Sequence, residues 1–156
     1  MKLRNEKTYY PEGQIKREKY YLNDKLHRED GPAWINYNES GGINEEWYYL
    51  NDKLHREDGP AIICYYENKV VERECYYVDA QYHRENGPSF ISYYKTGSVK
   101  LEEYCLRGKI HREDGPAIIW YNGNGRIKRK KYWLNNEEVT DEFQLLVIQG
   151  LEMENK

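Results

Sequence analysis

The chain has 156 residues, a formal net charge of −3 and 33% charged residues, and its mean hydropathy is −1.09. Such polarity is typical of disordered chains, but 17 Tyr and 4 Trp supply more aromatic surface than disordered segments carry, so we expect one folded domain. The slightly acidic charge argues against nucleic acid as the main partner. Nothing at the N-terminus resembles a signal peptide, and no apolar run reaches the roughly 18 residues of a membrane span. These features predict a soluble, cytoplasmic protein that does not bind membranes.

The cysteine pattern limits the chemistry further. Cys64, Cys75 and Cys105 make an odd number and include no C-x-x-C spacing. Neither a disulfide framework nor a zinc module is therefore expected, and the thiols are predicted to be reduced. We predict no cofactor and no metal site.

An internal repeat organises the chain. The four histidines of the sequence, His27, His55, His83 and His111, are each 28 residues apart, and "LNDKLHREDGPA" occurs identically at 22–33 and 50–61. A fixed internal period indicates a repeat architecture in which each unit packs mainly against its neighbours. We divide the single domain into an N-terminal half repeat (1–26), four 28-residue repeats (27–138) and a C-terminal helical cap and tail (139–156).

Within each repeat the sequence predicts a β-hairpin. Segments such as "PAIICYYE" and "VVERECYYV" are rich in β-branched and aromatic residues, and "SGG", "TGS" or "NGNG" separates them. A second tight turn, "LNDK" or "LRGK", follows, and the segment H-R-E-D-G-P, here called the box, leads into the next hairpin. The prediction is an all-β, single-layer, elongated antiparallel meander. After Asn136 the period ends, and Thr140 is predicted to be the N-cap of a short capping helix.

Strand alternation separates two faces of the predicted sheet. If Ile35 lies opposite Tyr48, the recurring apolar residues share one face. The same register places Cys64 directly opposite Cys75, with Cα atoms within about 6 Å of each other.

The other face varies from repeat to repeat and is aromatic. Its residues are Trp34, Trp47, Tyr49, Tyr66, Tyr77, Phe90, Tyr94, Trp120 and Trp133. Exposed aromatic residues can simply form cross-strand pairs that stabilise a sheet. However, Tyr and Trp also anchor interfaces, and the variation of this face between repeats favours recognition of a protein partner. We therefore predict that these nine residues form a protein-binding surface.

The box combines a histidine, an arginine and acids, which raises the question of catalysis or metal binding. Catalysis needs one constellation, whereas the box occurs four times, and Asn86 replaces the aspartate in the third copy. Asp and Asn share the ability to form Asx-turns, glycine supplies permissive φ, and proline can begin a strand without donating a ladder hydrogen bond. The box is therefore predicted to be a turn and the protein not an enzyme. Its His and Arg would brace neighbouring turns, with Glu29, Glu57, Glu85 and Glu113 as the arginine partners.

An alternative is that the boxes bind a small anionic or nucleotide ligand, because arginine suits bidentate recognition of phosphate and carboxylate. The residues of this alternative site are His27, Arg28, His55, Arg56, His83, Arg84, His111 and Arg112.

The segment "RIKRKKYW", 126–133, is basic. Lysines and stacked rings could bind nucleic acid, but alternate residues point to opposite faces and lysine on an exposed strand prevents edge aggregation, which is the favoured interpretation. The open first strand also allows a homodimer through the sheet edge.

Two hairpins, "YYENKVVERECYYVD" and "YNGNGRIKRKKYWLNN", carry a family resemblance. They resemble MORN-type repeats, in the divergent form found in bacterial MORN-like antitoxins and in repeat proteins of phages and giant viruses. The resemblance covers about Tyr9 to Asn136, although the box is an addition to the ordinary, shorter MORN unit. It implies a twisted sheet whose groove binds proteins as an antitoxin or a scaffold, in the host cytoplasm if the protein is viral.

Overall fold

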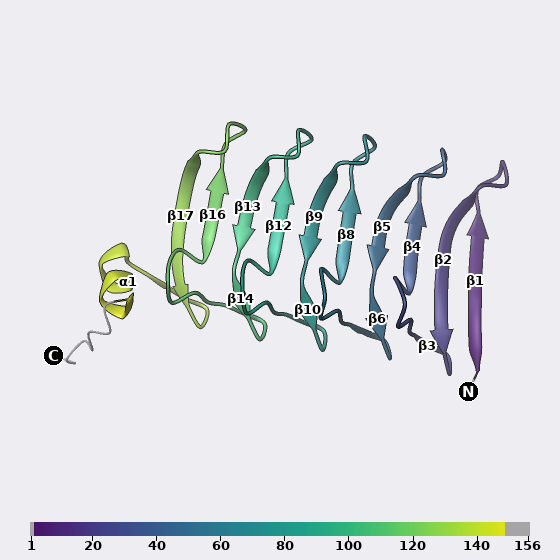
Figure 1. Ribbon diagram of the computed structural model, residues 1–156, viewed down its shortest axis with the longest axis horizontal. Coiled ribbons are helices and arrows are strands. Elements are labelled where there is room, and N and C mark those ends of the chain that lie inside the picture. The colour runs from purple at the N-terminus through teal and green to yellow at the C-terminus, as the bar shows by residue number, and fades with distance from the viewer. Residues whose placement is uncertain (1, 149–156) are drawn as a thin grey trace.

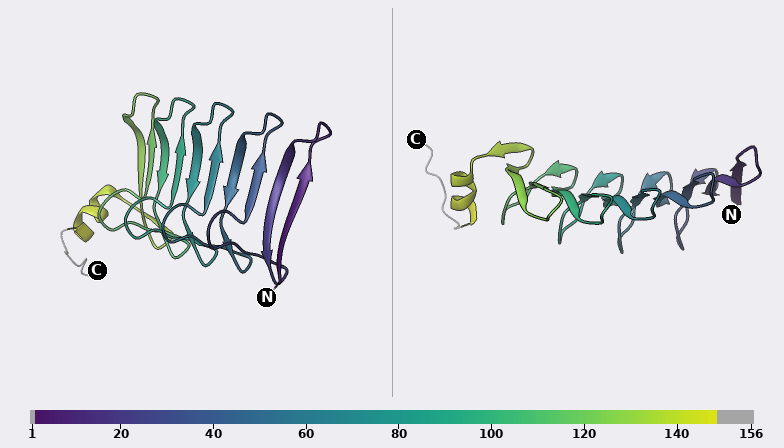
Figure 2. Two further views of the ribbon diagram at one scale, coloured as in Figure 1. Left: turned by 45° about the vertical axis from the view of Figure 1, so that its right-hand side comes forward. Right: turned by 90° about the horizontal axis from the view of Figure 1, so that it is seen from above.

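The computed structural model describes residues 2–148, so residues 149–156 of the predicted cap and tail lie outside the described residues. The fold is nearly all-β: a 12-stranded antiparallel sheet in the order β1-β2-β4-β5-β8-β9-β12-β13-β16-β17-β18, with β3 paired to β2 (Figure 1). The sheet is a single elongated layer that is not closed into a barrel (Figure 2). The predicted meander of repeated hairpins is therefore confirmed.

Long hairpins alternate with short ones along the chain. The long hairpins are β1 (Leu3–Tyr9) with β2 (Ile15–Leu22), β4 (Trp34–Tyr37) with β5 (Ile43–Trp47), β8 (Ile62–Tyr65) with β9 (Val71–Cys75), β12 (Phe90–Tyr93) with β13 (Val99–Glu103), and β16 (Ile118–Tyr121) with β17 (Ile127–Leu134). The short strands are β3 (Lys25–Leu26), β6 (Tyr49–Leu50), β7 (Lys53–Leu54), β10 (Tyr77–Val78), β11 (Gln81–Tyr82), β14 (Cys105–Leu106), β15 (Lys109–Ile110) and β18 (Glu137–Val139). The half repeat 1–26 supplies the first long hairpin and β3.

The second tight turn of each repeat forms as predicted. Asn51 and Asp52, between β6 and β7, have φ angles of 51° and 65°. Two successive residues with positive φ are typical of a type I′ turn, in which Asn and Asp are tolerated. The turn reverses the chain and directs it into the box.

The predicted register is wrong by two residues. Ile35 lies opposite Glu46, not Tyr48, because the hairpin turn closes tightly, with the Asn38 amide donating to the Gly42 carbonyl. A shift of two residues preserves side-chain alternation, so the predicted division into two faces is unaffected. Cys64 is opposite Arg73, and the predicted Cys64–Cys75 pair does not form.

The recurring face contains a column that the sequence analysis missed. Across the sheet the directly paired residues alternate between isoleucine and glutamate, in the order Glu18, Ile35, Glu46, Ile63, Glu74, Ile91, Glu102, Ile119, and then Lys130. Tyrosine hydroxyls donate to these carboxylates, for example Tyr65 to Glu46 at 2.7 Å and Tyr93 to Glu74 at 2.9 Å. These hydrogen bonds satisfy carboxylates that stand among packed side chains.

Glu18 shows how far these contacts compensate for burial. It is 7% exposed, accepts a 2.6 Å hydrogen bond from Tyr20, and lies 3.0 Å from the Lys7 ammonium. Burial alone would raise the pKa of Glu18, but these two contacts outweigh burial and lower the pKa.

A short helix, α1 (Asp141–Ile148), follows the sheet. The Phe143 amide donates to the Thr140 hydroxyl at 3.2 Å, which confirms Thr140 as the N-cap. The Lys130 ammonium lies 3.3 Å from the Asp141 carboxylate. The helix therefore stands beside the last long strand, at the C-terminal end of the sheet (Figure 1).

Candidate functional site

Each box histidine ties its box to the second tight turn of the same repeat. Its Nδ1 accepts a hydrogen bond from the backbone amide of the following tight turn, at 3.2 Å from Asn51 to His27, 3.2 Å from Asp79 to His55, 3.1 Å from Arg107 to His83 and 3.2 Å from Asn135 to His111. Since an accepting Nδ1 carries no proton, the proton resides on Nε2. In three copies Nε2 lies 3.5 to 3.6 Å from the glutamate of the same box. The prediction that histidine braces the neighbouring turn is confirmed.

Each box arginine packs against a tyrosine ring of the preceding repeat and bonds within its own box. The Arg56 guanidinium lies 4.0 Å from the centre of the Tyr48 ring, donates to Asp58 at 2.7 Å and donates to the Pro60 carbonyl at 3.3 Å. Arg28 and Arg112 repeat these contacts. The predicted arginine partners were the glutamates, and this is wrong: the aspartate two residues after the arginine reaches its Nε, while the glutamate faces the histidine.

The third box lacks the aspartate. Arg84 keeps the ring contact with Tyr76 at 3.9 Å and the hydrogen bond to the Pro88 carbonyl at 3.2 Å. The contacts of the arginine with the tyrosine ring and the proline carbonyl therefore form without the aspartate, which adds a further hydrogen bond in the other boxes.

The box glycine gives the arginine room. A Cβ atom at Gly59 would lie 3.0 Å from the Arg56 Cζ, and at Gly31 the corresponding distance to Arg28 is 3.2 Å. Of the four box glycines only Gly87 has a φ in the left-handed region, at 132°. The predicted need for permissive φ therefore applies to Gly87, and close approach of the guanidinium explains the glycine in the other copies.

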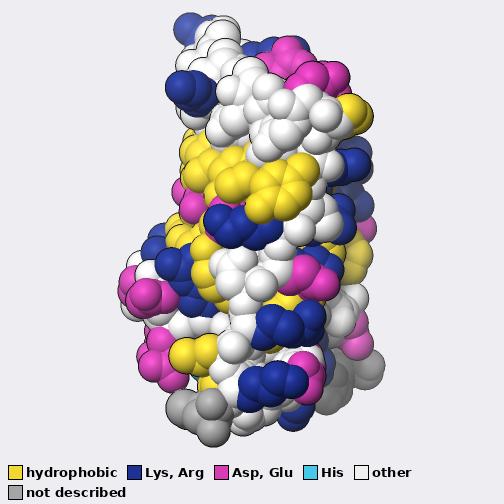
Figure 3. Space-filling model, turned by 90° about the vertical axis from the view of Figure 1, so that its right-hand side faces the viewer, with side chains coloured by type: hydrophobic (Ala, Val, Ile, Leu, Met, Phe, Trp, Pro, Cys, Tyr) yellow, Lys and Arg dark blue, Asp and Glu magenta, His cyan; other side chains and the backbone are white. Residues whose placement is uncertain are grey.

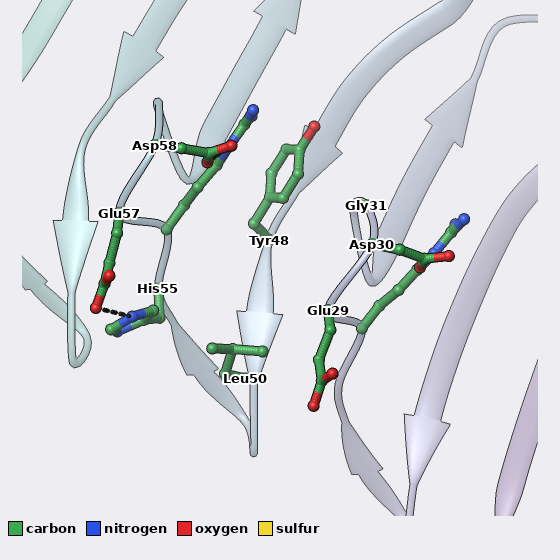
Figure 4. A pocket seen from close by; sticks show the side chains of 10 residues that line it. Glu29, Asp30, Gly31, Tyr48, Leu50, His55, Glu57 and Asp58 are labelled. Atoms are coloured by element: carbon green, nitrogen blue, oxygen red, sulfur yellow. Dashed lines mark hydrogen bonds and ion pairs between the residues drawn. The ribbon is translucent and has the colours of Figure 1, made fainter.

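A row of hollows lies between consecutive boxes. The hollow between the first two boxes has a volume of about 570 Å³, and Tyr48 and Leu50 lie between the boxes that flank it (Figure 4). Equivalent hollows lie between the second and third boxes and between the third and fourth boxes. The side chains of Glu57 and Asp58 are 84% and 83% exposed, but that of Arg56 is only 23% exposed. The Arg56 guanidinium holds the pKa of Asp58 below its usual range. The hollows thus present carboxylates to the solvent, which favours the structural role of the box over the binding of an anion.

The aromatic face contains one compact cluster, formed by Trp34, Trp47 and Tyr49 and here called the tryptophan cluster. Trp34 and Trp47 are directly opposed on β4 and β5, with ring centres 5.8 Å apart, and the Trp47 and Tyr49 ring centres are 6.4 Å apart at an interplanar angle of 6°. All three side chains are half-buried. Aromatic residues with one face packed and one face open are the typical anchors of protein interfaces.

Polar residues on the same face fix the cluster. The side-chain oxygen Oδ1 of Asn36 accepts a hydrogen bond from the Trp34 indole at 2.9 Å, and the Glu45 carboxylate accepts one from the Trp47 indole at 3.3 Å. Asn36 also donates to Glu45 at 2.7 Å, and the Lys19 ammonium lies 3.9 Å from the centre of the Trp34 ring. Sequence reasoning missed these residues as part of the site, although polar residues in alternation with the tryptophans were the available signal.

The other predicted aromatic residues are spread along the sheet. Tyr77 and Phe90 pack against the buried Ile62, Cys64 and Cys75. The Tyr66 and Tyr94 hydroxyls donate to backbone carbonyls of the next hairpin, at 2.8 and 2.9 Å. Trp120 and Trp133 lie under Arg129 and Lys131, at 5.3 and 5.7 Å. Of the nine candidates, Trp34, Trp47 and Tyr49 have stacked rings, and Trp47 also packs with Tyr77 and Phe90 against the same three buried residues.

The thiols do not form a reactive site. Cys64, Cys75 and Cys105 are buried free cysteines, and burial raises the pKa of Cys75 and of Cys105 to about 11. A high pKa and burial make a poor nucleophile. Within residues 2–148 no group of three or more His, Cys, Asp or Glu side chains is arranged to hold a metal ion, and no helix of that range is long and apolar enough to cross a membrane.

The single-layer meander and its repeated box define a β-hairpin repeat protein. Comparison of the chain with sequence models of known families, with curated proteins and with solved structures finds no match. The function is therefore argued from the geometry of the chain itself.

Proposed function

We propose that the protein is a non-enzymatic repeat module of MORN-like type that binds another protein through its variable aromatic face, as a cytoplasmic antitoxin or scaffold. The tryptophan cluster carries this proposal. It is half-buried, it is held rigidly by Asn36 and Glu45, and it occurs in one repeat alone. At the position equivalent to Trp47, the half repeat and the other repeats have Lys19, Cys75, Glu103 and Lys131.

In a repeat protein, a feature found in one repeat alone is more easily assigned to recognition than to folding. Residues that hold each unit to the next must recur, as the box does, whereas a surface selected for one partner need not. Pre-organised aromatic side chains lose little conformational entropy on binding, which suits them to anchor an interface. The cluster therefore has the properties of an interface hot spot and is not needed in every repeat.

The proposal is tested by affinity capture from the native host with wild-type protein and with the Trp34→Gln/Trp47→Gln variant. We expect a specific partner that the variant loses, while circular dichroism and the melting temperature show that the variant remains folded. The control variant Leu3→Gln/Tyr9→Gln replaces side chains that are 79% and 57% exposed at the sheet end, and it should retain the partner. Equal capture by the folded tryptophan variant would contradict the proposal.

A further inference from the structure

The last long strand has an open edge. Strand β17 pairs with β16 through Ile127–Lys131 on one side, and with β18 through Tyr132–Leu134 on the other. Among the described residues no strand pairs with the outer side of Ile127–Lys131. Helix α1 lies beside the lower end of β17 and leaves the upper part open (Figure 1). Open strand edges are templates for pairing with another chain.

The interior repeats show how a strand would add to this edge. At the preceding boundary Leu101, Glu102 and Glu103 of β13 lie opposite Trp120, Ile119 and Ile118 of β16. The Tyr104 amide donates to the Ala117 carbonyl at 2.8 Å across that boundary. Strand alternation then directs the backbone of Glu102 to the same side. A shift of 28 residues maps Glu102 onto Lys130, so the backbone amide and carbonyl of Lys130 face the open side. Lys128 lies at the bulge of β17, where the register with β16 shifts between Trp120 and Tyr121.

The open edge is basic, unlike every interior edge. Lys128, Arg129, Lys130 and Lys131 are consecutive, and β17 contains no acid. Lys130 lies at the repeat position that is a glutamate in the other repeats, namely Glu18, Glu46, Glu74 and Glu102. The C-terminal segment already supplies acids to its lower end, because Lys131 lies 2.7 Å from Glu138. The edge is therefore complementary to an acidic strand.

A second copy of the chain is a poor occupant. The N-terminal end of the sheet, at β1, mixes basic, acidic and apolar side chains (Figure 3). If β1 of another copy added to β17 in the repeat register, its Lys7 would oppose Lys130, since Lys7 is equivalent to Ile119. Directly opposed like charges destabilise a strand pair. The same register places Glu6 opposite Lys131, so β1 offers this edge one like-charge pair and one opposite-charge pair, and a uniformly acidic chain is the better complement.

We propose that the outer edge of β17, Ile127–Lys131, binds an extended acidic segment of a partner protein as an added antiparallel strand. Backbone hydrogen bonds to Lys130 provide the pairing, and carboxylates of the segment face Lys128 and Arg129, because Lys130 and Lys131 already contact Asp141 and Glu138. This surface is separate from the tryptophan cluster, so either proposal can fail without the other.

The test measures binding of a fluorescent peptide that alternates glutamate and valine, by anisotropy at low and at physiological salt. We expect saturable binding that Lys128→Glu weakens about fivefold or more at low salt. The matched control is Lys100→Glu, because Lys100 is the repeat equivalent of Lys128 but lies on β13, whose two edges are both paired. It should leave the affinity unchanged, as should Trp34→Gln/Trp47→Gln.

A second peptide distinguishes strand addition from simple charge attraction. Proline at its centre removes a backbone donor and keeps every charge, so strand addition predicts loss of binding. Three outcomes would each overturn the proposal: no binding of the acidic peptide, undiminished binding of the proline peptide, or equal weakening by Lys100→Glu and Lys128→Glu.

Discussion

Arg56 illustrates what a single residue does in this fold. Its guanidinium lies between the Tyr48 ring, 4.0 Å away, and the backbone of Gly59, where a Cβ atom would be 3.0 Å from Cζ. Gly59→Ala should therefore displace the guanidinium and lower the free energy of unfolding by about 1–3 kcal/mol. Gly123→Ala is the control, because a Cβ there meets nothing within 4 Å. Chemical denaturation measures both variants, and equal effects would show that the arginine contact is unimportant.

His55 tests the hydrogen bond between a box and the tight turn that follows it in the same repeat. His55→Ala removes the acceptor of the Asp79 amide and a side chain that is only 17% exposed. We expect a loss of about 1–2 kcal/mol in the free energy of unfolding, with the partner interaction of the folded protein intact. Glu57→Gln, which changes the exposed neighbour of His55, should have no measurable effect. If binding to the captured partner vanished in folded His55→Ala, the box would be a binding site and not a turn.

The box aspartates predict a dependence on pH. The Arg56 hydrogen bond lowers the pKa of Asp58 below its ordinary value of 3.8. A carboxyl whose pKa is lower in the folded state stabilises the fold at pH values above its ordinary pKa. This stabilisation is lost as the pH falls through the lowered pKa. Asp58→Asn should therefore lower the melting temperature at pH 7, and the difference from wild type should shrink as the pH falls below about 4.

The reverse substitution, made in the third box, is the control for Asp58→Asn. Asn86→Asp places a carboxylate two residues after Arg84, as in the other boxes, so it should raise the melting temperature at pH 7 and lose this advantage in acid. A pH-independent effect of either substitution would exclude the ion pair as the cause.

At the scale of the strand, the hairpins, the tight turns, the two faces and the Thr140 cap could be predicted from the sequence, because alternation, turn residues and the 28-residue period are local signals. The register could not, since it depends on how tightly the turn at Asn38–Gly42 closes. The arginine partners could not be predicted either. The glutamate follows the arginine directly and the aspartate comes one residue later, so both carboxylates are within reach, and only the path of the backbone through the box decides which one contacts Nε.

The glutamate column was missed because a pattern search places only apolar residues inside. Burial and the bond to Glu74 raise the pKa of Tyr93, as expected for a hydroxyl that donates to a carboxylate. Tyr93→Phe leaves the Glu74 carboxylate without that donor and should cost about 1–2 kcal/mol of unfolding free energy. Tyr9→Phe, at a residue that is 57% exposed, should cost little. Similar effects of the two substitutions in denaturant titrations would show that the column contributes nothing specific.

For the whole molecule, the claim is that the chain is a stack of equivalent units, each joined to the next by its box and by strand pairing. Such a stack has no long-range contacts that require a particular number of units. Removal of one complete period, residues 50–77, joins Tyr49 to Val78, which are adjacent in the repeat pattern, and it retains the tryptophan cluster. Removal of residues 50–69 disrupts the period.

The thermal unfolding curve of the chain that lacks residues 50–77 is the most direct test. We expect β-sheet circular dichroism and one cooperative transition at a somewhat lower melting temperature than that of the full chain, while the chain that lacks residues 50–69 loses cooperativity. If the chain without residues 50–77 were unfolded, or if the two shortened chains behaved alike, the repeats would not be equivalent units and the box would not be the element that joins them.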